Sequence, residues 1–184
     1  MIFLDLIKVR QSVRKYTGEP VEDSALRRCL EAARLAPSAS NSQPWTFIVV
    51  DDPLLKNKVA NLTFDSIVSF NKFVVEAPVL VVFVIEKPKM VTRIGGFIKK
   101  IQYPKIDIGI AAAHFSLQAA EEGLGTCMLG WFREKPIKTI LGIPAGKKIG
   151  LIISVGYAPK DYKIREKIRK SYTDVVHRNS YTSK

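Results

Sequence analysis

The sequence predicts one globular domain built from both helices and strands. Segments with a helical period alternate with short apolar runs of strand length, and no Pro/Gly/Ser-rich linker divides the 184 residues. Apolar residues make up 47% of the chain and charged residues 25%, which is typical of a folded protein rather than a disordered one. A domain of this length can bury a sizeable core, so we expect residues 1–184 to form a single unit.

The first half of the chain predicts helices around one early strand. A helical period covers residues 2–9, and a second helix opens at Glu22 and Asp23, because acids favour the first turn of a helix. Pro37 ends that helix. Next come a strand at Phe47–Val50 and one or two helices over 53–73, a range that includes Ile67. Val79–Ile85 is apolar at every position, as expected for a strand that is covered on both faces.

The second half predicts a long helix followed by two strands. Residues 86–105 break the pattern and are interpreted as a mobile insertion that forms a lid. Ile106–Glu122 is apolar almost all round, so we expect a helix that is buried on every side, partly at a subunit interface. The remaining elements are a strand at Thr126–Leu129, a short helix at Pro136–Leu141, a strand at Gly150–Tyr157, and an extended basic tail over 158–184 with Tyr172, Val175 and Val176 as anchors.

The net charge of +12 is concentrated in two segments. Residues 86–105 hold six basic residues and one acid, and residues 160–170 hold six basic residues and two acids, so the two segments carry +5 and +4. A local excess of this kind suits either nucleic acid or a small anionic ligand. The sequence has no DNA- or RNA-binding signature and no long basic helix. We therefore expect a phosphorylated ligand and no nucleic-acid partner.

The sequence also indicates the compartment. No apolar run approaches the roughly 20 residues of a membrane span, and Asp5 within the first apolar residues argues against a secretory signal. Cys29 and Cys127 have neither metal-ligand spacing nor a disulfide framework. We therefore expect a cytoplasmic protein without membrane contact, in which both cysteines are small buried hydrophobic residues.

The most informative motif is the stretch 37–45, which reads Pro-Ser-Ala-Ser-Asn-Ser-Gln-Pro-Trp between a helix and a strand. Its two prolines restrict the backbone at both ends. Hydrogen-bond donors and acceptors are offered by Ser38, Ser40, Asn41 and Gln43. Loops beside a sheet often carry binding function. The alternative is a loop that only caps its own backbone.

A second motif, Arg-Gln-Ser-Val-Arg, places Arg10, Ser12 and Arg14 on one side of an extended chain. Two guanidiniums and a hydroxyl suit a phosphate, because arginine donates to oxyanions through two N–H groups. The alternative is a solvated basic turn. A third motif, the glycine-rich stretch 123–130, does not form a phosphate-binding P-loop: Trp131 stands where the lysine is required, and the order is helix then strand.

Taken together, these motifs resemble the nitroreductase family of FMN-dependent enzymes, and a basic Lys-Ile-Arg-Lys stretch near the C-terminus adds to the resemblance. The resemblance implies an α+β fold, with a central mixed, mostly antiparallel sheet flanked by helices, in a domain-swapped homodimer with FMN at the interface. Its implied FMN-binding residues are Arg10, Gln11, Ser12, Arg14, Lys167 and Arg169 around the phosphate and ribityl chain, Pro37, Ser38 and Asn41 from the other subunit at the ring, Met128, Leu129 and Gly130 near N5, and Asn71.

The same resemblance implies a reaction. NAD(P)H gives a hydride to flavin N5, and a small electron acceptor such as a nitroaromatic or a quinone then takes the electrons. No side chain is expected to be catalytic, which fits the absence of a Gly-x-Ser-x-Gly elbow and of clustered histidines and cysteines. The alternative is a non-enzymatic flavin-binding module for storage or sensing.

Overall fold

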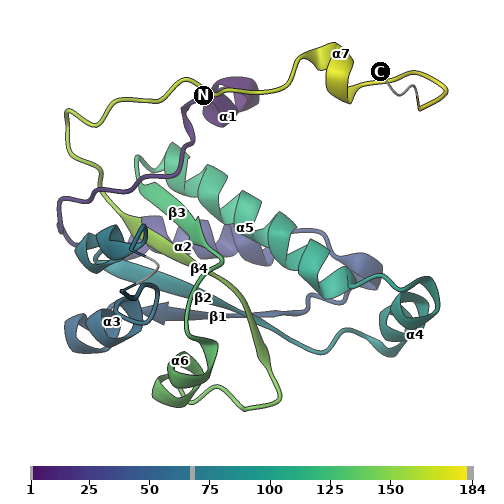
Figure 1. The fold of residues 1–184 in the computed structure, drawn as a ribbon, viewed down its shortest axis with the longest axis horizontal. Helices are drawn as coiled ribbons and strands as arrows, with labels where there is room; N and C mark the ends of the chain where they lie inside the picture. The colour runs from purple at the N-terminus through teal and green to yellow at the C-terminus, as the bar shows by residue number, and fades with distance from the viewer. Residues whose placement is uncertain (1, 67–68, 182–184) are drawn as a thin grey trace.

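The chain folds into three layers around one small sheet (Figure 1). The computed structural model describes residues 2–66 and 69–181, so the helical assignment of Ile67 lies outside the described residues. The helices are α1 (Phe3–Val9), α2 (Asp23–Arg34), α3 (Pro53–Ala60), α4 (Met90–Lys99), α5 (Tyr103–Glu121), α6 (Glu134–Ile140) and α7 (Tyr172–Val175), with short 3-10 turns η1 (Ala39–Asn41) and η2 (Lys72–Glu76). The strands are β1 (Trp45–Val50), β2 (Val79–Ile85), β3 (Gly125–Leu129) and β4 (Lys148–Gly156).

The sheet has the strand order β1-β2-β4-β3, and each neighbouring pair is antiparallel. Its register places Phe83 of β2 opposite Phe47 on β1 and opposite Leu151 on β4. An isolated parallel bridge joins Ser12 to Thr126 of β3. The described sheet is therefore antiparallel throughout rather than mixed, and the parallel Ser12 bridge lies outside its four strands.

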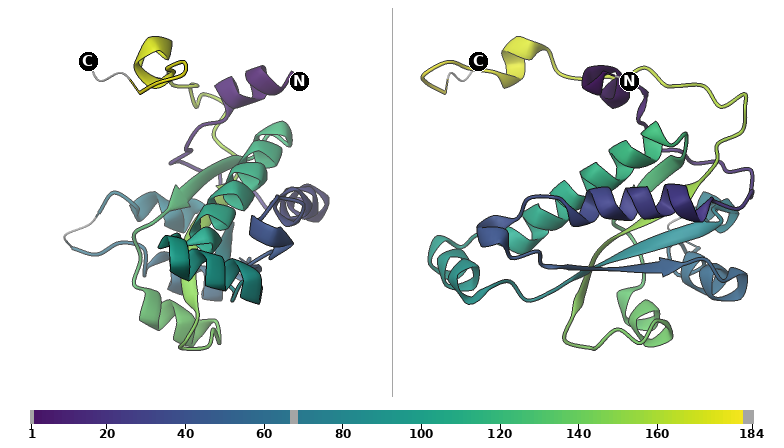
Figure 2. Two further views of the ribbon diagram at one scale, coloured as in Figure 1. Left: turned by 90° about the vertical axis from the view of Figure 1, so that its right-hand side faces the viewer. Right: turned by 180° about the vertical axis from the view of Figure 1, so that it is seen from behind.

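Strand β2 is buried on both faces because helices cover both sides of the sheet (Figure 2). Alternate side chains of a strand point to opposite faces. Val79, Val81 and Phe83 pack in the cluster that contains residues of α2 and α5, whereas Leu80, Val82 and Val84 pack in the cluster that contains residues of α3 and α6. The uniformly apolar sequence of β2 is explained by this double coverage, as predicted.

The segment 86–105 is not the irregular insertion that the pattern predicts. Residues 90–99 form α4, and α5 already begins at Tyr103. Two adjacent glycines obscure the helical period, because glycine is a poor helix former. Gly96 is nevertheless required, since a Cβ there would lie 2.7 Å from the carbonyl oxygen of Ile101 where the chain turns back.

Helix α5 has one open side in a single chain, whereas the prediction expects burial on every side, partly at a subunit interface. Phe115 is fully buried in the core, whereas Ile106 is 53% exposed and Gly109 and Ala113 are exposed as well. The proposed tail anchors are likewise uncovered in a single chain, with Tyr172 at 76% exposure. Within the described residues, no helix has both the length and the apolar character that a membrane crossing requires.

Candidate functional site

The segment that follows α1 lies against the start of β3. The backbone N–H of Val13 donates to the carbonyl oxygen of Thr126 at 2.9 Å, beside the Ser12 bridge. This approach requires Gly125, because a Cβ at that position would lie 2.7 Å from a methyl group of Val13. Gly123 has a φ of +74° and turns the chain after α5. The glycines of the stretch Gly123-Leu124-Gly125 therefore allow the segment with the N-terminal arginines to pack against β3.

The C-terminal tail runs beside this N-terminal segment (Figure 1). The side chain of Gln11 donates to the carbonyl oxygen of Lys163 at 3.2 Å and accepts from the backbone N–H of Arg165 at 3.0 Å. Further hydrogen bonds join the two stretches. The N–H of Arg14 donates to the hydroxyl of Tyr162 at 3.0 Å, the guanidinium of Arg165 donates to the carbonyl oxygen of Ser12, and the ammonium of Lys167 donates to the carbonyl oxygen of Arg10.

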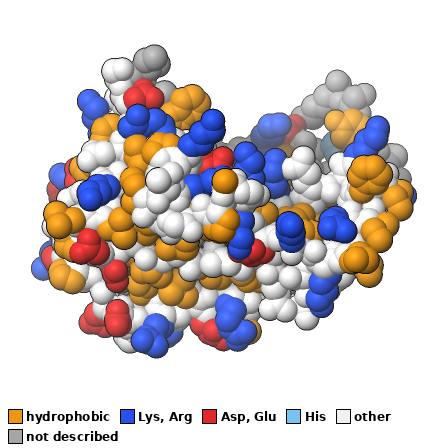
Figure 3. Space-filling view, turned by 90° about the horizontal axis from the view of Figure 1, so that it is seen from below, with side chains coloured by type: hydrophobic (Ala, Val, Ile, Leu, Met, Phe, Trp, Pro, Cys, Tyr) orange, Lys and Arg blue, Asp and Glu red, His pale blue; other side chains and the backbone are white. Residues whose placement is uncertain are grey.

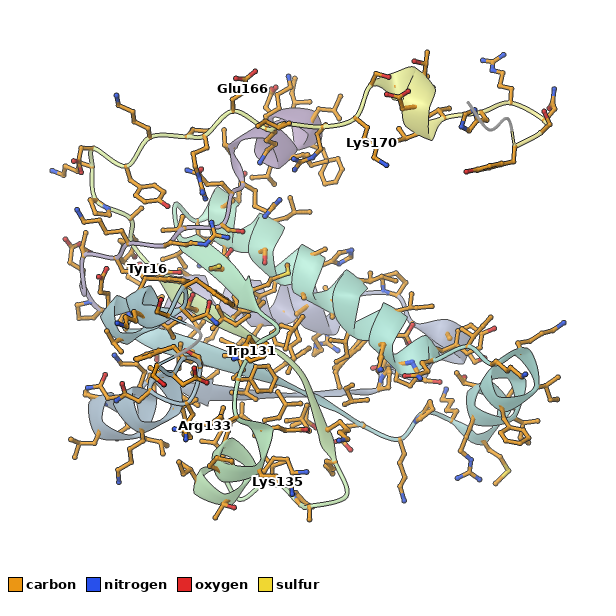
Figure 4. All side chains as sticks on the ribbon, in the orientation of Figure 1. Tyr16, Trp131, Arg133, Lys135, Glu166 and Lys170 are labelled. Carbon is orange, nitrogen blue, oxygen red and sulfur yellow. The ribbon has the colours of Figure 1, made fainter. Side chains whose placement is uncertain are left out.

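Four cations gather where the two stretches meet, and we call Arg10, Arg165, Lys167 and Arg169 the cation cluster. Among the described residues, none of the four forms an ion pair with an acid. Glu166 lies within the same tail but points away from α1 in Figure 4. Burial, followed by the charges of Arg10, Arg169 and Arg165, lowers the pKa of Lys167. An uncompensated cluster of this kind suits a multiply charged anion such as a phosphate.

Ser12 and Arg14 lie next to the cluster, above the buried thiol of Cys127. Burial raises the pKa of that thiol, and the charges of Arg14 and Arg165 together with a hydrogen bond to Ser12 act in the opposite direction. Both cysteines are free and buried, as predicted. The structure thus brings together all the predicted phosphate residues of the N-terminal motif and of the tail.

Arg165 is the residue of this site that the sequence reasoning missed. It contacts both Gln11 and the Ser12 carbonyl, so it joins the two stretches and adds a charge. A signal for it exists in the sequence. Arg165, Lys167 and Arg169 are spaced by two, and alternate residues of an extended chain share one side.

The outer edge of β3 offers backbone donors beside the cluster. Thr126 directs its carbonyl toward Val13, so its backbone groups point away from β4. Backbone direction alternates along an antiparallel strand, so Met128 also presents its N–H group to the outer edge, and Gly130 follows directly after the strand ends. Leu129 is paired with Ile152 and its backbone faces β4. Of the three predicted residues, Met128 and Gly130 are therefore the ones whose backbone could meet a ligand.

The loop of residues 37–44 is tightly bonded within itself. The hydroxyl of Ser38 accepts from the backbone N–H of Gln43 at 2.9 Å, and the side-chain oxygen of Asn41 accepts from the side-chain amide of Gln43 at 2.9 Å. Pro37 precedes this bonded part of the loop, and Leu35 and Ala36 separate it from the end of α2. The 37–44 loop therefore has one defined shape that presents several polar groups.

The 37–44 loop and the cation cluster lie at opposite ends of α5 in one chain (Figures 1 and 2). The loop contacts Asp107 in the second turn of the helix. Arg10 and Gln11 instead line a cavity of about 160 Å³ together with Ala120 at the other end. The 13 residue steps from Asp107 to Ala120 span about 20 Å at 1.5 Å per step. A single chain does not bring these two groups of predicted residues together.

Asn71 is buried and bonded within the protein. Its side-chain amide donates to the carbonyl oxygens of Thr63 at 3.0 Å and Trp131 at 3.3 Å. It thereby fixes the segment after β3, where Trp131 is 54% exposed and is seen in Figure 4 below the strand. A role for Asn71 in cofactor binding stays a prediction.

Comparison with known proteins identifies the protein family to which this fold and these motifs belong. The family model described as the nitroreductase family matches residues 7–157. A protein of Archaeoglobus fulgidus with the provisional name NADH dehydrogenase/NAD(P)H nitroreductase is 31% identical, over 97% of this chain and 98% of its own length. The NADH dehydrogenase of Thermus thermophilus is 28% identical, over 83% of this chain and 84% of its own length.

A solved structure gives the same result for the fold. The FMN-dependent nitroreductase from Clostridium difficile R20291 matches with a TM-score of 0.74 at 29% identity, covering 97% of this chain and 99% of that one. The fold and the matches together define an oxidoreductase with an α+β architecture. The chain belongs to the nitroreductase family, and the resemblance that its motifs predict is confirmed.

Proposed function

We propose that the protein is an FMN-dependent oxidoreductase that works as a homodimer and passes electrons from NAD(P)H to a small acceptor. The observation that carries this proposal is the cation cluster. Two of its four cations, Arg165 and Lys167, donate to backbone carbonyls of the N-terminal segment, and none of the four forms an ion pair with an acid among the described residues. A terminal phosphate would supply the missing negative charge.

FMN, when bound, supplies the redox chemistry between NAD(P)H and an acceptor such as a nitroaromatic or a quinone. The residues of this chain bind and orient it. The cation cluster and Ser12 hold the phosphate and the ribityl chain. The N–H groups of Met128 and Gly130 donate to the edge of the ring, where a positioned donor stabilises negative charge. No side chain is needed as a general acid in this arrangement.

A second copy of the chain would complete the site. Two α5 helices that pack in opposite directions bring the 37–44 loop of one copy to the cation cluster of the other. The exposed Gly109 and Ala113 would allow close packing of the two helices. Phe3 and Leu4 of α1 are 61% and 65% exposed in one chain, and an apolar surface of this kind indicates a partner. Pro37, Ser38 and Asn41 would then meet the ring from the partner copy.

The absorption spectrum of the protein as purified tests the proposal. We expect two flavin bands that bleach when NADH or NADPH is added without oxygen, and that return when menadione is added. A colourless protein that does not bind added FMN would refute the proposal. Tightly bound FMN without any turnover would favour the storage or sensor alternative. A sedimentation measurement that gives only monomer for the FMN-loaded protein would refute the homodimer.

A further inference from the structure

A single residue, Ala39, ties the 37–44 loop to two helices. Its backbone N–H donates to Oδ1 of Asp107 on α5 at 3.1 Å, and its carbonyl oxygen accepts from the hydroxyl of Thr92 on α4 at 3.2 Å. Asp107 is 3% exposed and Thr92 is 5% exposed. Both hydrogen-bonding groups of Ala39 are therefore held by buried side chains from outside the loop.

The loop needs such restraint because its backbone is strained. Ser40, Asn41 and Gln43 have φ values of 50°, 49° and 47°, in the left-handed region that residues with a side chain seldom adopt. Backbone of this kind persists where the surrounding structure fixes it, and it is often found at functional sites. The two bonds to Ala39 come immediately before the first strained residue.

A carboxylate is an unusual choice for the position of Asp107. Its second oxygen, Oδ2, is buried and has no hydrogen-bond partner among the described residues. A buried carboxylate oxygen without a partner is unfavourable, and an asparagine would instead place an NH2 group with two donors at the same point. A charged acceptor, however, holds an N–H more strongly than a neutral one. The carboxylate of Asp107 therefore strengthens the hydrogen bond to Ala39, although one of its oxygens stays buried without a partner.

Thr92 links the loop to α4, a helix whose residues are mostly exposed. Its hydroxyl also lies 2.8 Å from the hydroxyl of Ser42, which accepts from the N–H of Lys89 at 3.3 Å. The later turns of α4 carry Ile94, 52% exposed, and Phe97, 87% exposed. Figure 3 shows hydrophobic and basic side chains together at the end of the molecule that carries α4. A contact made on this helix would act on the loop through Thr92.

We propose that Asp107 and Thr92 are positioning residues that fix Ala39 and thereby hold the 37–44 loop in the shape that contacts the flavin ring. Thr92 makes this shape depend on α4, so that occupation of the α4 surface changes the surroundings of the ring. The proposal rests on the proposed function for the identity of the ligand. The restraint on the loop itself can be measured without any ligand.

Thr92→Val tests the restraint, because it removes the hydroxyl and keeps the volume. In the full-length protein, hydrogen exchange of the peptide 37–45 should become about three- to tenfold faster, the factor expected for one lost hydrogen bond. Thr92→Ser keeps the hydroxyl and should restore the slow exchange. Thr139→Val removes a comparable hydroxyl bond within α6, from Thr139 to the Lys135 carbonyl, and should leave this peptide unchanged. Equal exchange in Thr92→Val and Thr139→Val would overturn the proposal.

Asp107→Asn tests the carboxylate, since it keeps an acceptor and removes the charge. The peptide 37–45 should exchange faster, because a neutral acceptor holds the N–H of Ala39 less strongly than a carboxylate does. In the FMN-loaded enzyme, Asp107→Asn and Thr92→Val should both shift the flavin absorption bands and raise the KM for menadione more than they lower kcat. A fall in melting temperature with unchanged loop exchange would make Asp107 a purely structural residue. A wild-type protein that lacks FMN refutes the proposed function, whereas unchanged exchange refutes the restraint alone.

Discussion

Replacing Lys167 by methionine should weaken FMN binding by about 10- to 150-fold and weaken riboflavin binding much less. The Lys167 ammonium lies near Arg10, Arg165 and Arg169 and donates to the Arg10 carbonyl. A hydrogen bond to a charged group contributes about 1.5–3 kcal/mol, and each 1.4 kcal/mol is about a factor of ten in affinity. The melting temperature of the flavin-free protein should change little, because relief of repulsion between cations offsets the lost bond to Arg10.

The assay is a titration of the flavin-free protein with FMN and, separately, with riboflavin, which lacks the phosphate, followed by flavin fluorescence. Lys135→Met on α6 is the matched control, because it removes one exposed lysine far from the cluster (Figure 4). Raising the salt concentration should weaken FMN binding more in the wild type than in Lys167→Met. Equal losses for FMN and riboflavin, or full FMN affinity in Lys167→Met, would refute the assignment of the phosphate to the cation cluster.

Three other outcomes are expected. FMN binding should weaken as the pH rises through the lowered pKa of Lys167, because the ammonium form attracts the phosphate. When the dissociation constant is measured against pH, this weakening at alkaline pH should be absent in Lys167→Met. Gly125→Ala should destabilise the protein by about 1–3 kcal/mol in thermal unfolding, since its Cβ would meet Val13, whereas Gly146→Ala, where a Cβ meets open space, should have little effect. Phe97→Ser on the exposed face of α4 should raise the KM for menadione in steady-state kinetics without lowering the flavin content, and loss of flavin would instead place α4 in the cofactor site.

Local patterns predict much of the fold because they depend on residues that are near one another in the chain. Continuous apolar residues identify β2, and the acids at Glu22 and Asp23 together with Pro37 bracket α2. Helix α4 was not predicted, because glycines and lysines hide its period. The sequence indicates that α5 is apolar almost all round, but only the structure shows which side is open in a single chain, because small apolar residues look alike in a core and at an uncovered surface.

By itself, the sequence determined the family, the α+β class and the two motifs that carry the binding chemistry, since those motifs consist of residues that are close in sequence. Only the tertiary structure decided how distant parts of the chain meet. In the structure, Gln11 is hydrogen-bonded to Arg165, Val13 packs against Gly125, and Ala39 is hydrogen-bonded to side chains of two helices. These contacts connect positions from 53 to 154 residues apart, and no local preference of the backbone encodes them. The same geometry separated the 37–44 loop from the cation cluster, because the rigid length of α5 lies between them.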